Sequence, residues 1–73
     1  MPMEAITKRT AQVIRENRKR AGLSQEALAE KADIDRTYVS LIERGKVNIT
    51  LIVASKIARA LNLPLSKIIK DVE

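Results

Sequence analysis

Mostly apolar side chains in the first part of the chain recur every three or four residues, the spacing of one face of an α-helix. This pattern predicts a helix over residues 4–20. The positions expected to face inward are Ile6, Thr10, Val13, Ile14, Asn17 and Ala21. Gly22 comes next, and glycine there ends a helix at little cost because it readily adopts a left-handed conformation.

Two shorter helices are predicted next, each preceded by a residue type that caps helix N-termini. Ser24 precedes a predicted helix over residues 25–32, and Asp35 precedes one that starts at residue 36 and stops at Gly45. Apolar pairs flank each cap as hydrophobic staples: Leu23 with Leu28, and Ile34 with Val39. Two capped helices joined by a turn over residues 33–35 predict a helix-turn-helix over about residues 24–45.

The last third of the chain is apolar around most of the helical circumference. Thr50 caps a predicted helix to about Leu61, and Pro64 starts a short fifth helix. Because this is more apolar surface than one small core can use, we expect residues 49–73 to form a two-fold dimer interface. The residues expected there are Leu51, Ile52, Leu61, Leu63, Leu65, Ile68 and Ile69. The alternative is that all seven fill the core of one chain.

Five predicted helices in 73 residues leave no room for a sheet or a second domain. The expected fold class is therefore all-α, with a single domain over residues 1–73. A chain of this length is near the lower limit for folding on one core, and without cysteines it cannot use disulfides. Both facts favour a homodimer.

The residue types that most enzymes and metal sites depend on are missing. The chain has no His and no Cys, and it has no glycine-rich loop that would hold a phosphate. We therefore expect no enzyme activity, no metal and no other cofactor. No apolar segment approaches the length of a membrane span, so we expect a cytoplasmic protein without membrane contact.

The net charge of +5 is unevenly distributed along the chain. Residues 1–22 carry +4 and residues 46–73 carry +3, whereas residues 23–45 carry −2. Basic surface in two separate segments is expected of a nucleic-acid-binding protein, although a merely soluble surface would explain the charge alone about as well.

The start of the third predicted helix has the chemistry of a DNA-reading surface. In a helix-turn-helix this end of the second helix enters the major groove. Arg36 offers paired donors to guanine, Thr37 reaches a base, and Ser40 lies one turn later on the same face. Tyr38 is expected to bond a phosphate, and Gln25 lies beside the DNA backbone.

Purely structural roles remain open for these side chains. Arg36 would then pair with Asp33 on the surface, Tyr38 would lie at the edge of the core, and Ser40 and Gln25 would only fill helix positions. For Arg18 and Glu43, near the ends of two packed helices, we expect a structural ion pair rather than DNA contact.

The segment GLSQEALAEKADIDRTYVSLIERG resembles the Cro and phage-repressor type of helix-turn-helix, which is related to XRE-like regulators. Asp33 departs from the pattern, since Gly is usual at that turn position. The segment DRTYVSLIERGKVNITL is also similar to restriction-modification controller proteins, which are small dimeric regulators with five helices. The resemblance implies a lambda-repressor-like fold and dimerisation through the last two helices. It further implies base contacts by Arg36, Thr37 and Ser40 and backbone contacts by Gln25, Tyr38, Lys46 and Asn48.

The resulting hypothesis is a transcriptional regulator that binds a palindromic site on double-stranded DNA as a homodimer, in a restriction-modification system. A phage-type repressor, an antitoxin-like regulator and a protein-binding adaptor of the same fold are the alternatives. RNA polymerase is a further candidate partner, and we expect no small-molecule ligand.

Overall fold

The computed structural model describes residues 3–73, which form five helices and no strand. Residues 1 and 2, which the predicted domain includes, lie outside the described residues. The helices are α1 (Met3–Arg20), α2 (Gln25–Ala32), α3 (Arg36–Glu43), α4 (Leu51–Ala60) and α5 (Leu65–Val72). The all-α expectation is confirmed, and each predicted helix is present with ends that differ by a residue or two.

Polar side chains cap three of the helix starts as the sequence predicts. The Oγ of Ser24 accepts a 3.0 Å hydrogen bond from the N–H of Ala27 at the start of α2. Thr50 does the same for α4, where its Oγ1 accepts from the N–H of Val53 at 3.1 Å. Such bonds satisfy N–H groups that have no partner within the helix, and each stabilises its helix by about 1 kcal/mol.

The turn between α2 and α3 depends on Asp33. Its φ of 56° is left-handed, and its N–H donates to carbonyls at the end of α2. Ile34 also donates its N–H to the carbonyl of Ala29, at 3.0 Å. Asp tolerates this conformation better than most residues, so the turn forms without the glycine that is usual there.

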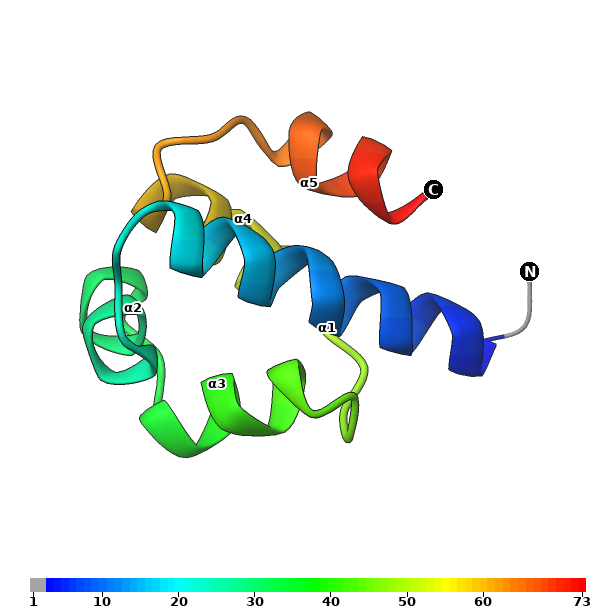
Figure 1. Cartoon of the computed structure of the whole chain (residues 1–73), viewed down its shortest axis with the longest axis horizontal. Helices are drawn as coiled ribbons and strands as arrows, with labels where there is room; N and C mark the ends of the chain where they lie inside the picture. Colours follow the sequence, from blue (N-terminus) through cyan, green and yellow to red (C-terminus); the bar gives the residue numbers. More distant parts are fainter. Residues whose placement is uncertain (1–2) are drawn as a thin grey trace.

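In Figure 1, α1 crosses the molecule, with α3 on one side and α5 on the other. The shorter α2 packs on both α3 and α4, and α4 packs on α5. The Nε of Arg9 donates to the carbonyl of Asp71 at 3.1 Å, so the beginning of α1 lies near the end of α5. This arrangement leaves the first turn of α3 at the surface.

The core has a main cluster beneath the helix-turn-helix and a smaller one between α1, α4 and α5. The main cluster consists of Ile14, Leu28, Ala29, Ala32, Val39, Ile42, Ile57 and Leu61. The smaller one consists of Val13, Ala58 and Ile68. Of the predicted inner face of α1, Ile6 and Ala21 are exposed instead.

Two residues expected at a dimer interface lie in the core of the single chain instead. Leu61 is 9% exposed and Ile68 is 3% exposed, so each has little surface left for a second copy to cover. Leu63 and Leu65 are half-buried and also pack against the core clusters. Apolar spacing alone could not separate these positions from exposed ones, because it does not show which apolar residues neighbouring helices cover.

Candidate nucleic-acid interface

The N-terminal end of α3 presents its first side chains to solvent. Asp35 precedes the helix, and its Oδ1 accepts a 2.7 Å hydrogen bond from the N–H of Thr37. This cap fixes the direction in which the helix begins. Arg36 and Thr37 are both exposed, in line with the expectation that they face outward.

Tyr38 and Ser40 are less accessible than Arg36 and Thr37. Both are half-buried, and Tyr38 packs against the main core cluster. Tyr38 is thus at the edge of the core. This position is compatible with an outward-facing hydroxyl, because a tyrosine can bury its ring while its hydroxyl remains exposed to solvent.

The acid nearest to Arg36 is Glu26 on α2, rather than the expected Asp33. The Nη1 of Arg36 and the Oε2 of Glu26 are 3.9 Å apart, and the two side chains are 69% and 74% exposed. An ion pair this open contributes at most about 1 kcal/mol to stability. Glu26 was not among the residues predicted from the sequence. Residue types and spacing gave no signal for it, because the pair depends on how α2 and α3 cross.

Gln25, the predicted backbone contact on α2, bonds to a carboxylate at the end of α3. Its Nε2 donates to the Oε1 of Glu43 at 3.2 Å. The carboxylate of Glu43 is only 2% exposed, so the amide group of Gln25 is held between a buried acceptor and the surface. One of its N–H groups is thereby engaged within the protein.

Arg18 and Glu43 form a two-pronged ion pair that joins α1 to α3. The Nε and Nη2 of Arg18 donate to the two carboxylate oxygens of Glu43, at 2.7 and 2.9 Å. The hydrogen bonds to Glu43 raise the pKa of Arg18, and burial opposes this effect without overcoming it. Arg15, which was not predicted to take part, donates to the backbone carbonyl of Glu43 at 2.8 Å. The end of α3 is thus fixed to α1 by two arginines.

Lys46 and Asn48, the other predicted backbone contacts, lie in the loop after α3. Both are exposed, and they line a polar cleft of about 430 Å³ between this loop and α1. The hydroxyl of Thr7 donates to the Oδ1 of Asn48 at 2.7 Å, which ties the loop to the first turns of α1. Lys8 adds a second cation to the cleft. No local sequence pattern indicated the tie, since it joins positions far apart in the chain.

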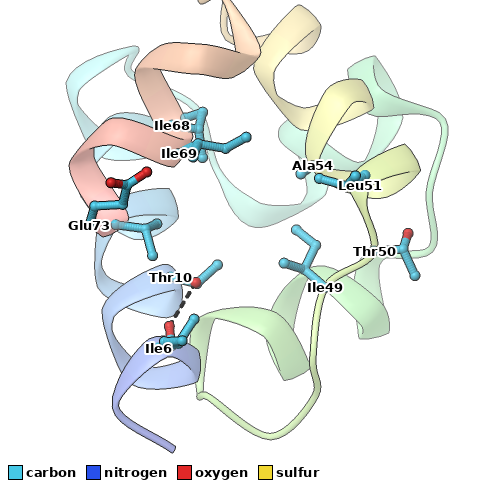
Figure 2. A pocket seen from close by; sticks show the side chains of 10 residues that line it. Ile6, Thr10, Ile49, Thr50, Leu51, Ala54, Ile68, Ile69 and Glu73 are labelled. Carbon is cyan, nitrogen blue, oxygen red and sulfur yellow. Dashed lines mark hydrogen bonds between the residues drawn. The ribbon is translucent and has the colours of Figure 1, made fainter. Parts of the chain in front are cut away.

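An apolar groove of about 350 Å³ opens between α1, α4 and α5, as Figure 2 shows. Leu51 and Ala54 of α4 face Ile68 and Ile69 of α5 across it. The most exposed large apolar side chains of the described residues lie in it or next to it: Leu51 (70%), Ile52 (72%), Ile6 (42%) and Ile69 (40%). Three of these were expected at a dimer interface, whereas Ile6 was assigned to the core.

Residues 3–73 hold neither a cluster of metal-binding side chains nor a helix that could span a membrane. The Asp and Glu side chains described there form no group that would hold a metal ion, and the chain has no His or Cys. None of the described helices combines the length and the apolar character that crossing a membrane requires.

Comparison with known proteins gives consistent matches. A family model described as helix-turn-helix matches residues 14–68. Control protein C.MunI from a Mycoplasma species is 43% identical over 56 residues, which cover 77% of this chain and 76% of that protein. The structure of the restriction-modification controller protein C.AhdI from Aeromonas hydrophila is similar at a TM-score of 0.81, with 40% identity over 86% of this chain and 94% of that one.

A further solved structure includes DNA. It is the restriction-modification controller protein C.Esp1396I, solved as a tetramer in complex with its natural 35 base-pair operator. Its chain is similar to this one at a TM-score of 0.80, with 32% identity over 92% of this chain and 93% of that one.

Proposed function

This chain belongs to the helix-turn-helix family of DNA-binding transcriptional regulators, and we propose that it acts as a homodimer on a palindromic operator to control a restriction-modification system. The observation that carries the proposal is the capped start of α3, where Arg36 and Thr37 are exposed. In this family of motifs, that end of the helix enters the major groove.

Base reading is assigned to the exposed face of α3. Arg36 has a planar guanidinium that donates two parallel hydrogen bonds to O6 and N7 of guanine. Thr37 supplies a hydroxyl and a methyl group, which suit a base edge or the methyl group of thymine. Ser40 is one turn further along and less exposed, so it has less surface available for a base contact than Arg36 and Thr37.

Backbone contacts are assigned to residues on both sides of α3. Gln25 precedes it at the start of α2, while Lys46 and Asn48 follow it beside the polar cleft. Tyr38 would contribute its hydroxyl. These contacts hold the protein in register on the duplex but carry no direct sequence information.

Dimerisation is assigned to the exposed apolar rim of the groove between α1, α4 and α5. Leu51, Ile52 and Ile69 leave apolar surface that a second copy would cover. A two-fold dimer places two recognition helices about 34 Å apart, one turn of DNA, and therefore reads a palindrome.

The controller role is supported by the relatives. C.AhdI is a restriction-modification controller protein and C.MunI is a control protein, and this chain covers most of the length of each. For this chain, the genomic test is whether genes for a methyltransferase and an endonuclease adjoin its own gene. Their absence would favour another role for a DNA-binding regulator of this fold.

The decisive experiment is selection of bound duplexes from a random-sequence pool, followed by affinity measurements with Arg36→Ala. We expect enrichment of a palindrome, with the variant losing about 1–3 kcal/mol of binding and its preference at one base position. Arg59→Ala is the matched control, because it removes the same charge from an exposed position on α4. Equal binding to all duplexes, with Arg36→Ala no different from Arg59→Ala, would contradict the proposal.

A further inference from the structure

The helix-turn-helix carries more acidic than basic residues, although it is the segment proposed to meet DNA. Three of its acids have structural roles. Glu43 is paired and buried, Asp35 caps α3, and Asp33 forms the left-handed turn. The other two, Glu26 and Glu30, are both exposed on α2. An exposed carboxylate near DNA weakens binding, so its position needs an explanation.

Glu26 differs from Glu30 in what it faces. It lies in the first turn of α2, directly after Gln25, and its Oε2 is 3.9 Å from the Nη1 of Arg36. Because both side chains of the pair are largely exposed, the pair is not needed to hold the fold together. It lies where the proposed backbone contact and the proposed base contact meet.

We propose that Glu26 is a specificity-determining residue, which limits the pairing of Arg36 with DNA phosphates. This inference rests on the proposed DNA-reading role of Arg36. A long arginine side chain outside the groove can bind any phosphate, which strengthens binding to every sequence alike. The carboxylate of Glu26 offers Arg36 an alternative partner and repels an approaching phosphate.

Glu26 weakens the pairing of Arg36 with guanine less than its pairing with phosphate, and the sizes of the two interaction energies explain why. An exposed ion pair changes an equilibrium by about fivefold at most. A bidentate contact from arginine to guanine discriminates by about tenfold to a hundredfold. Arg36 therefore leaves Glu26 for the correct base, whereas a phosphate gains too little to overcome both the pairing and the repulsion.

The experiment compares Glu26→Gln with Glu30→Gln, which removes the same charge from an exposed position one turn further along α2. Affinities are measured on the selected operator and on a scrambled duplex of equal length, at several salt concentrations. For Glu26→Gln we expect binding to the scrambled duplex to strengthen about threefold and more than binding to the operator. The ratio of the two affinities then falls. Glu30→Gln should shift both affinities alike.

Repeating both substitutions in the Arg36→Ala background tests whether Glu26 acts through Arg36. We expect the two variants to become equivalent there, because the arginine on which Glu26 acts is gone. An unchanged affinity ratio for Glu26→Gln, or a change that persists without Arg36, would overturn the inference and leave the DNA-binding role intact. If the unmodified protein does not distinguish the two duplexes, the proposed function fails as well. Unfolding curves of both variants separate any loss of helix stability from these effects.

Discussion

Arg18 and Glu43 face each other across the junction of α1 and α3, joined by two parallel hydrogen bonds of 2.7 and 2.9 Å. Their side chains are 11% and 2% exposed. A carboxylate this deeply buried requires a cation, and the same arginine also donates to the carbonyl of Leu23 at 2.8 Å. One side chain thus connects the end of α3 to the turn before α2.

Arg18→Met should lower the free energy of unfolding by about 3–5 kcal/mol, because it leaves the Glu43 carboxylate buried without its cation. Chemical denaturation measures this loss. Lys67→Met is the control, since Lys67 pairs with Asp71 at the surface and its loss should cost no more than about 0.5 kcal/mol. Similar losses of unfolding free energy in both variants would mean that water or other groups compensate the charge of the Glu43 carboxylate.

Titration of Arg18 should add no pH dependence to the stability of the unmodified protein in the neutral range. A raised pKa in the folded protein stabilises it at all pH values below the unfolded pKa, and that stability is lost only as pH rises through the folded pKa. The pKa of Arg18 is raised by its hydrogen bonds to Glu43, so this loss lies far above neutrality. Denaturation of the unmodified protein at about pH 6 and about pH 9 should therefore give similar unfolding free energies, since the chain also has no His or Cys. A marked difference would point to titration elsewhere in the network.

Ile52→Lys should prevent dimerisation without unfolding the chain, because the side chain is 72% exposed. Leu61→Ala should instead lower the unfolding free energy by about 2–5 kcal/mol, since it opens a cavity in the core. Sedimentation equilibrium and denaturation together separate the two effects. A stable dimer of Ile52→Lys would exclude this residue from the interface.

Tyr38→Phe should weaken binding to every duplex by about threefold to tenfold, the effect of losing one hydrogen bond to a phosphate. Base preference should be unchanged, since phosphate contacts carry no sequence information. Affinity measurements on the selected operator and on single-base variants of it provide the test. A changed preference at one position would mean that the hydroxyl contacts a base.

Asp33→Gly should raise the unfolding free energy by about 0.5–1 kcal/mol, because glycine adopts a φ of this sign without strain. Asn62 has a similar φ of 59° after α4, so Asn62→Gly serves as a second test of the same effect. A loss of stability in Asp33→Gly alone would show that the Asp33 side chain makes a contribution of its own.

Much of the fold could be predicted from the sequence because the determinants are local. Ser24, Asp35 and Thr50 each cap a helix with a bond to an N–H two or three residues later. The pairing of Arg18 with Glu43 could also be predicted from the sequence, since this fold packs their two helices together.

The remaining contacts depend on how the helices pack. The contacts of Glu26 with Arg36 and of Thr7 with Asn48 depend on how α1, α2, α3 and the loop after α3 are arranged in space. The exposure of Ile6 and the burial of Leu61 in the main core cluster likewise depend on helix packing rather than on apolar spacing. Periodicity identifies an apolar face but not which part of it a neighbouring helix covers.

Tyr38 is the one aromatic residue in the sequence, and its ring packs against the main core from the recognition helix. All near-ultraviolet absorption, circular dichroism and intrinsic fluorescence from aromatic side chains therefore originate at a single point. That point lies where unfolding of the core and docking on DNA would both alter the surroundings of the ring. Tyr38 can therefore serve as an intrinsic spectroscopic probe, and changes in the aromatic signal of the protein can be assigned to this one side chain without any label.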